Sequence, residues 1–283
     1  MNQFAHVSRF ELTATRSTSG NTFIEDSFFT SPFKIMKPFA QDNGSVAVFL
    51  QSASPGILED DSQIHKIKVN RGAGLEIRSQ SFEKIFKMDP GKSAERKITA
   101  EVADDATLIY RPLPCIPFSQ SNFSSVTEIK LAATSRLIYE DCICAGRCAH
   151  GELFDFTQYK NLIKIYREGH LIYRDNLFLQ GSDGNTHPER KKLLQGKTMF
   201  ANYTHCGGML IFGYANSTNI KDLRATLGLD EKLLYTEHTE QNAAHDTLVD
   251  ISENDHGDFI IRCLANSAEK IQNLFEKIRT HLR

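Results

Sequence analysis

Short runs in which apolar and polar residues alternate recur through most of this chain, and they constrain its fold more than any other feature. Side chains in a strand point alternately to opposite faces, so each run has one apolar face, which is the signature of a half-buried strand. Turn-forming Gly, Pro, Asn and Asp separate the runs, with no helical pattern between them. The clearest runs are residues 22–25, 46–50, 67–69, 75–78, 107–110, 126–131 and 259–262. The pattern predicts an all-β-dominated fold of two stacked sheet layers or a β-solenoid-like scaffold.

Helical patterns appear only near the C-terminus. Residues 267–282 carry apolar residues at helical spacing, with Asn266 or Ser267 as the N-cap. A shorter helix is expected at 220–227, ended by Gly228. The polar residues 181–190 are expected to form an exposed, mobile loop. We interpret residues 1–283 as one domain, with a boundary near this loop as the alternative.

Composition excludes several classes of function. The 283 residues are 40% hydrophobic and carry a net charge of −2, so no basic surplus indicates a nucleic-acid partner. No stretch approaches the roughly 20 apolar residues of a membrane helix. The first 15 residues lack the apolar core of a secretion signal, and the six cysteines are then expected to be reduced thiols. These features predict a cytoplasmic protein that binds neither nucleic acid nor membrane.

The cysteines of residues 140–154 raise the question of a metal site. In a continuous strand Cys142, Cys144, Cys148 and His150 would share one face, with same-face neighbours roughly 6.6 Å apart. Thiolates that share a zinc ion lie no more than about 4.6 Å apart, so a regular strand does not form the site. We interpret these thiols as small buried residues. The alternatives are a structural or transit metal site formed by a bend at the intervening glycine, or a metal-dependent enzyme built on the cluster.

An ordered series of short motifs also carries a family resemblance. In chain order the segments are Ser31–Phe39, Ser54–Asp61, Arg71–Ile77, Ser79–Phe86 and Pro112–Phe118, followed by Gly146-Arg147 and Gly151-Glu152-Leu153-Phe154. This succession resembles the UreD family of urease accessory proteins, called UreH in some bacteria. The match spans about residues 10 to 180, and the C-terminal amphipathic helix fits as well.

The resemblance implies a scaffold rather than an enzyme, with no catalytic residues. Members of this family bind the accessory protein UreF, recruit the GTPase UreG through it, and dock on the urease apoenzyme. Nickel is expected to pass through a water-filled interior, so no cofactor is tightly bound and Ni²⁺ is only transient. The alternative is a pure interaction module that positions the GTPase without contacting metal.

The resemblance also transfers roles to particular positions. The acidic positions expected along the nickel passage are Asp61, Asp141, Glu152 and Asp175, although Asp60 stands where the family has a glycine before the first of them. The polar residues expected to line the passage are Glu83, Lys84 and Arg147. The cysteines of the 142–148 segment do not belong to the family pattern, which supports their interpretation as buried residues.

The chemistry of nickel is compatible with an acidic passage. Ni²⁺ accepts imidazole, carboxylate and water ligands, whereas thiolates would hold it tightly and release it slowly. Several weak sites along a wet channel allow an ion to enter and leave. Buried carboxylates are costly without partners, so water or a cation such as Arg147 or Lys84 is expected close by.

Overall fold

The structure, a computed structural model, describes residues 7–229 and 247–282. The strands of the N-terminal half are β1 (Val7–Arg16), β2 (Thr22–Phe29), β3 (Phe33–Ile35), β4 (Phe39–Ala40), β5 (Val46–Ser52), β6 (Ser62–Val69), β7 (Gly74–Ser79), β8 (Glu83–Ile85), β9 (Ala94–Val102), β10 (Thr107–Arg111), β11 (Cys115–Pro117) and β12 (Asn122–Leu131). The later strands are β13 (Arg136–Cys144), β14 (Gln158–Arg167), β15 (His170–Gln180), β16 (His205–Phe212), β17 (Thr247–Glu253) and β18 (Phe259–Ala265). The helices are the 3₁₀ turn η1 (Cys148–His150), α1 (Pro188–Gln195), α2 (Ile220–Thr226) and α3 (Ala268–Leu282).

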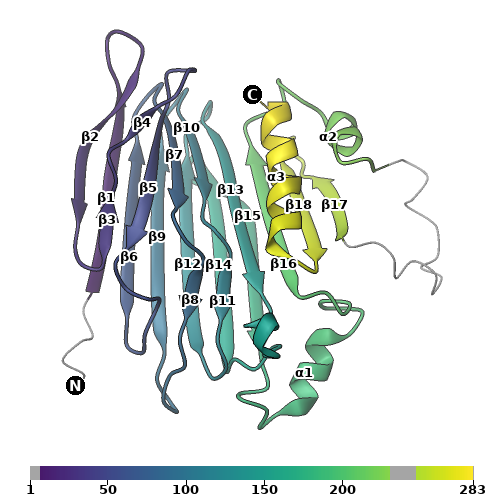
Figure 1. Ribbon diagram of the computed structural model, residues 1–283. Coiled ribbons are helices and arrows are strands. Elements are labelled where there is room, and N and C mark those ends of the chain that lie inside the picture. The colour runs from purple at the N-terminus through teal and green to yellow at the C-terminus, as the bar shows by residue number, and fades with distance from the viewer. Residues whose placement is uncertain (1–6, 230–246, 283) are drawn as a thin grey trace.

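These strands form two stacked sheets, and the chain coils between them (Figure 1). Sheet A has the order β15-β14-β12-β9-β6-β1-β2, and the main path of sheet B is β17-β18-β16-β13-β10-β7-β5-β3. From β5 to β14 the long strands alternate between the sheets, and neighbours within each sheet run parallel. Each coil therefore adds one strand to each layer. The predicted two-layer, β-solenoid-like scaffold is confirmed, and each strand run singled out in the sequence lies within a strand.

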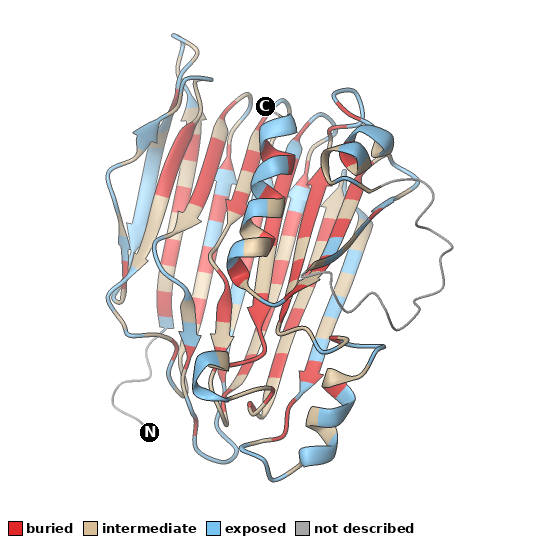
Figure 2. Cartoon of the chain, turned by 45° about the vertical axis from the view of Figure 1, so that its right-hand side comes forward, coloured by how far each residue is buried: buried red, intermediate tan, exposed pale blue. Residues whose placement is uncertain are grey.

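The core is the layer of side chains between the sheets. Burial alternates along the strands, as along β12, where every second residue is buried (Figure 2). Apolar side chains of both sheets meet in this layer, including Phe10, Leu75, Leu108, Ile129 and Ile165. Most of the core therefore comes from one inward-facing position in two, as the alternating pattern predicts.

The C-terminal helix covers the outer face of sheet B. The buried stripe of α3 is Ile271, Phe275 and Ile278, which pack against apolar residues of β16 and β18. The Ser267 hydroxyl accepts a hydrogen bond from the Lys270 amide at 3.4 Å, which satisfies one free amide of the first turn. The two helices expected at 220–227 and 267–282 are confirmed. No helix in the described part of the chain is long and apolar enough to span a membrane.

The segment 181–190 is only partly the expected loop. Helix α1 begins at Pro188, so the last three residues of the segment are helical. Proline has no amide hydrogen to lose at the first position of a helix, which explains why the helix begins there. Hydrogen bonds of Ser182 hold the remaining loop in place. The Ser182 hydroxyl donates to Asp155 Oδ1 at 2.7 Å, and the Ser182 carbonyl accepts from the His187 amide at 2.8 Å.

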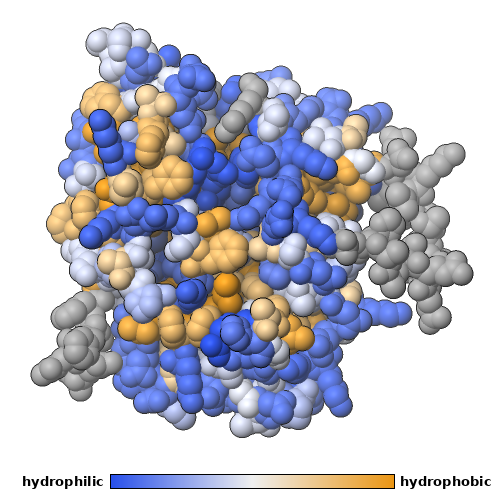
Figure 3. Space-filling view, in the orientation of Figure 1, coloured by the Kyte–Doolittle hydropathy of each residue, from blue (hydrophilic) through white to orange (hydrophobic). Residues whose placement is uncertain are grey.

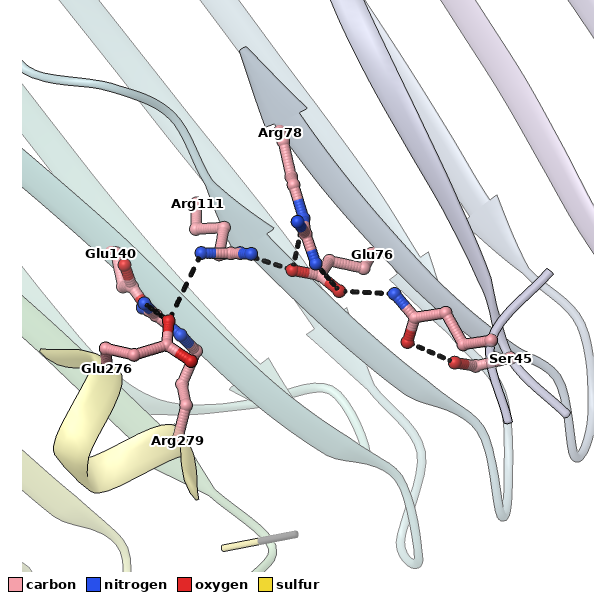
Figure 4. A network of polar contacts seen from close by, with 8 residues as sticks. Ser45, Glu76, Arg78, Arg111, Glu140, Glu276 and Arg279 are labelled. Carbon is pink, nitrogen blue, oxygen red and sulfur yellow. Dashed lines mark hydrogen bonds and ion pairs between the residues drawn. The ribbon is translucent and has the colours of Figure 1, made fainter. Parts of the chain in front are cut away.

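A network of ion pairs lies on the outer face of sheet B beside α3 (Figure 4). Its centre is Glu76 on β7, which is 1% exposed and accepts hydrogen bonds at 2.7 Å from both Gln41 Nε2 and Arg78 Nε. Arg111 on β10 also pairs with Glu76. Burial would raise the pKa of Glu76, but these hydrogen bonds and guanidinium charges lower it to about 2.

The same network fastens α3 to the sheet. Arg279 pairs with Glu140 on β13 and also with Glu276 one turn earlier in the helix, and Arg111 Nη1 lies 3.7 Å from Glu276 Oε2. The Arg279 side chain is only 5% exposed and that of Glu140 is 9% exposed. Removing one partner would leave the other charge buried and uncompensated.

We therefore expect Arg279→Met to lower the free energy of unfolding by about 3–5 kcal/mol in urea denaturation. The double variant Glu140→Gln, Arg279→Met should recover part of this loss, because it leaves no unpaired charge. The matched control is Lys130→Met, which breaks the exposed pair with Glu101 and should cost no more than about 1 kcal/mol. A loss for Arg279→Met no greater than that of the control would show that the buried pair does not anchor the helix.

Candidate functional site

Asp141 on β13 points into the layer between the sheets, while its neighbours Glu140 and Cys142 face α3. Asn161 Nδ2 on β14 of the opposite sheet donates to Asp141 Oδ2 at 2.9 Å. Gly208 is the cross-strand partner of Asp141, and a Cβ at that position would lie 2.6 Å from Asp141 Oδ1. The glycine therefore leaves room for the carboxylate.

Among the described residues, no cation directly contacts the carboxylate of Asp141. Burial and the nearby charge of Asp175 raise its pKa to about 6, against the lowering effects of Arg262, Asn161 and the Gly208 amide. A carboxylate of this kind gains from an arriving cation, since the cation replaces lost solvation.

Asp175 lies on β15, the edge strand of sheet A, at the more open side of this group. Its Oδ2 is 2.9 Å from Arg262 Nη2 on β18, and the same nitrogen donates to the Tyr173 hydroxyl at 3.0 Å. The Asp175 side chain is 26% exposed and that of Arg262 is 54% exposed, so water reaches this pair. The structure thus brings two predicted residues, Asp141 and Asp175, into one electrostatic group.

Hydroxyl groups continue the polar layer along the sheets from Asp141. Tyr139, two residues earlier on β13, stacks on Tyr110 with ring centroids 5.6 Å apart. The hydroxyls of Tyr139 and Thr127 lie 3.5 Å apart. Burial raises the pKa of Tyr110 to about 12, so this hydroxyl stays protonated at neutral pH.

Arg96 on β9 forms the next polar group of this layer. Its guanidinium donates twice to Gln63 Oε1, at 2.9 and 2.8 Å, and pairs with Glu83. His65 lies beside this group, and neither of its ring nitrogens has a hydrogen-bond partner within residues 7–229 and 247–282. Burial and the charge of Arg96 hold the pKa of His65 well below its usual value, so its imidazole is neutral.

A cavity of about 70 Å³ opens beside these side chains, large enough for water molecules between polar partners. Its polar lining includes Gln63, His65, Glu83, Lys84, Arg96 and Tyr110. We call this layer, from the cavity through Tyr110, Tyr139 and Asp141 to Asp175, the polar ladder.

The other predicted residues lie elsewhere. Glu152 forms a two-pronged ion pair with Arg147, with Arg147 Nε 2.8 Å from Glu152 Oε2, and the guanidinium carbon lies 4.3 Å from the centre of the Phe118 ring. The hydrogen bond from Arg147 lowers the pKa of Glu152 despite partial burial. Arg147 therefore pairs with Glu152, which is itself one of the predicted passage acids.

Asp61 occupies a turn just before β6. Its Oδ2 accepts a hydrogen bond from the Leu58 amide at 2.8 Å, and burial raises its pKa against that bond. Asp61 is not among the residues that line the cavity, whereas Lys84 lines it with an exposed side chain. Among the predicted acids, the structure groups Asp141 with Asp175 and leaves Asp61 and Glu152 apart from them.

The cysteine segment is not a continuous strand but bends at Gly146, the alternative that the sequence left open. Strand β13 ends at Cys144, and Gly146 has φ of +141°, a conformation that residues with a Cβ rarely adopt. Cys148 thereby comes to 3.5 Å from Cys144, sulfur to sulfur, while Cys142 packs toward α3 and His150 is exposed. Within residues 7–229 and 247–282, no three His, Cys, Asp or Glu side chains are placed to hold a metal ion.

Sequence reasoning missed several residues of the polar ladder: Gln63, His65, Arg96, Tyr110, Tyr139, Asn161 and Arg262. The alternating pattern of the strands could have identified some of these residues. Asn161 stands at an inward position of a strand whose neighbouring inward residues are Tyr159 and Ile163. A polar residue at such a position is unusual and needs a partner. The identity of that partner depends on how the strands are paired in space.

The fold and this interior define a class of protein: a two-layer β scaffold that encloses a ladder of charged and hydroxyl groups. The comparisons with known proteins identify the family. A family model for the UreD urease accessory protein matches residues 6–283, and the chain belongs to that family.

Relatives from several bacteria agree with this assignment. The chain is 34% identical to urease accessory protein UreH of Helicobacter hepaticus, with 96% of each chain covered. It is 32% identical to urease accessory protein UreD of Acetivibrio thermocellus over 99% of each chain. It is also 36% identical to UreH of Helicobacter pylori over 72% of this chain and 74% of that protein. These relatives bear the name of an accessory protein rather than that of an enzyme.

The raised pKa of Asp141 predicts a pH dependence of stability. Because the folded state binds this proton more tightly than the unfolded state, the stabilisation is complete below the unfolded pKa near 4 and is lost as the pH rises through about 6. Asp141→Asn removes this dependence. Relative to wild type, the variant should gain about 1–3 kcal/mol between pH 4 and pH 7.5, measured from urea unfolding at both values. An equal stability difference at the two pH values would contradict the assigned environment.

Proposed function

We propose that this chain is a non-catalytic scaffold for urease maturation that binds UreF, recruits the GTPase UreG through it, and assists nickel delivery to the urease apoenzyme. Membership of the UreD family supports the role in urease maturation. The six free cysteines are compatible with the cytoplasm, where we place this activity. Nickel is the cargo in this proposal rather than a resident cofactor.

The observation that carries the nickel part of the proposal is the enclosed carboxylate of Asp141 in the polar ladder. Carboxylate, neutral imidazole and water are all suitable Ni²⁺ ligands, and the ladder offers Asp141, Asp175, Glu83 and His65. These groups are spread along the layer instead of converging on one point, so each would bind the ion weakly. Shallow sites in series favour transfer over storage.

Exposed aromatic and aliphatic side chains support the scaffold part of the proposal. Figure 3 shows apolar patches on the side of the molecule seen in Figure 1, at the left over the region of β2 to β5. Exposed residues of these strands and the segment between them include Phe23 (46%), Phe28 (50%), Phe29 (42%), Met36 (43%) and Phe39 (53%). Large exposed apolar side chains that lie together on one surface are typical of protein interfaces. We propose that UreF covers part of this surface.

A second candidate function is an interaction module that positions the GTPase without contacting nickel. Two of the predicted acids favour this candidate because they already form ion pairs and are therefore less available to a metal ion. Glu152 pairs with Arg147, and Asp175 pairs with Arg262. The two candidates share the same complexes but differ in what the interior carboxylates do.

Alanine substitution of the predicted passage acids distinguishes the two candidate functions. We expect Asp141→Ala to lower the nickel content of co-expressed urease by roughly tenfold, equivalent to about 1.4 kcal/mol on the transfer barrier. Asp175→Ala should have a smaller effect in the same direction, and Asp61→Ala the smallest, because Asp61 lies outside the polar ladder; the accessory complex should stay intact in all of them. The matched control is Glu128→Ala on the outer face of sheet A, which pairs with Lys164 and should leave nickel content unchanged. Wild-type nickel content in all three variants would favour the interaction module.

The scaffold role predicts a stable complex with UreF. Co-expressed UreF should co-purify with this chain, and deletion of the chain should leave urease without nickel and without activity. Replacing Phe28 and Phe39 by Ser should weaken co-purification, since both side chains are exposed and their loss leaves the core unchanged. Fully active urease in cells that lack the chain would overturn the proposed function.

A further inference from the structure

The thiols of Cys144 and Cys148 face each other across the turn that ends β13. Their sulfur atoms are 3.5 Å apart, and both lie against the Gly146 carbonyl oxygen, at 2.9 and 3.5 Å. The turn depends on glycine, because a Cβ at position 146 would lie 2.8 Å from the Glu152 carbonyl oxygen. The backbone therefore holds the two thiols in contact.

The pair is asymmetric in a way that favours thiol chemistry. Cys144 is buried, whereas Cys148 is half-buried at the start of η1, next to the exposed residues Ala149 and His150. The hydrogen bond between the two thiols lowers the pKa of Cys148, while the same interaction and burial raise the pKa of Cys144. The lowered pKa favours the thiolate of Cys148 over that of Cys144, and thiolate is the nucleophilic form.

The other four cysteines lack this combination. Burial raises the pKa of Cys206 to about 12, and it also raises that of Cys115, Cys142 and Cys263. Thiols in such surroundings are protonated and inert. The contrast singles out one pair among six thiols.

We infer that Cys144 and Cys148 form a reversible dithiol–disulfide couple that a peroxide oxidises. The Cys148 thiolate attacks one peroxide oxygen; an S–O bond forms, the O–O bond breaks, and the leaving hydroxide takes up a proton to give water. The Cys144 sulfur then attacks the Cys148 sulfur as its own proton leaves; the S–S bond forms, the S–O bond breaks, and a second water departs. Two thiols and one hydrogen peroxide yield one disulfide and two waters, with two electrons moving from sulfur to oxygen.

The bond requires only a local movement. A disulfide is about 2.05 Å long, so the sulfurs must approach by about 1.5 Å, which the short, partly exposed η1 segment can supply. The product would close the turn that connects the strand of Asp141 with the Arg147–Glu152 ion pair. This inference does not rest on the proposed function, because it concerns only the thiols and the turn.

Peptide mapping provides the test. The reduced protein is freed of reductant, treated with hydrogen peroxide, alkylated and digested with trypsin. Cleavage after Arg136, Arg147 and Lys160 places Cys144 and Cys148 on separate peptides, so the disulfide joins residues 137–147 to residues 148–160. We expect this cross-linked species, loss of two of the six free thiols, and recovery of all six with dithiothreitol.

Single substitutions assign the bond. Cys148→Ser and Cys144→Ser should each abolish the cross-link, whereas Cys142→Ser, on the same peptide as Cys144, should retain it. The half-buried Cys148→Ser keeps the test valid if the buried Cys144→Ser variant fails to fold. The inference is overturned if all six thiols remain, if Cys148 is found as sulfinic acid without a cross-link, if Cys142 forms the bond, or if the cross-link joins two copies of the chain.

Discussion

The rest of this structure depends on one constraint: side chains alternate between the two faces of every strand. Successive long strands enter the two sheets in turn, so each strand turns one of its faces toward the other sheet. Each coil contributes one strand to each layer, and half of the residues of each strand face the same enclosed space. In parallel strands, residues at equivalent positions stack side by side, as Tyr110 and Tyr139 do. A polar residue at an inward position is therefore placed beside the next one. Because of this geometry, polar residues at a few inward positions of neighbouring strands are enough to form a continuous polar ladder.

Charge compensation separates the structural carboxylates from the candidate functional one. Glu76, on the outer face of sheet B, is surrounded by Arg78, Arg111 and Gln41, and its pKa falls to about 2. Asp141, between the sheets, has the neutral amides of Asn161 and Gly208 as hydrogen-bond partners, and its pKa rises to about 6. A buried carboxylate compensated by two arginines, as Glu76 is, has little affinity left for a metal ion. Asp141 is weakly compensated, and the proposed transfer of nickel through the polar ladder depends on this difference.

Local patterns predicted local structure well. Period-two runs identified the strands, and the apolar stripe of residues 267–282 identified the helix that covers sheet B. The patterns were less informative where one residue changes the backbone. Gly146 ends the strand within the cysteine segment, where a bend was the alternative, and Pro188 begins a helix where a loop was expected. Both residues can be read in the sequence, but their effect depends on the local backbone conformation, which the spacing of apolar residues does not predict.

Partners far apart in the sequence could not be predicted in this way. Arg262 reaches Asp175 from a strand of the other sheet, and Arg279 of the last helix pairs with Glu140 on β13. The resemblance placed Asp141 and Asp175 in a passage but offered no reason for their proximity. That reason is the contact of β13 with β14 across the two layers, with β15 next to β14 in sheet A, which only the three-dimensional structure provides.

The most direct measurement is anomalous diffraction at the nickel absorption edge from crystals of this chain with UreF, soaked in a nickel salt. The account predicts a partly occupied nickel peak between the sheets, within about 2–3 Å of a carboxylate oxygen of Asp141 or Asp175, and its loss in Asp141→Ala. Nickel found only at exposed histidines or at the Cys144–Cys148 pair, with none between the sheets, would contradict it.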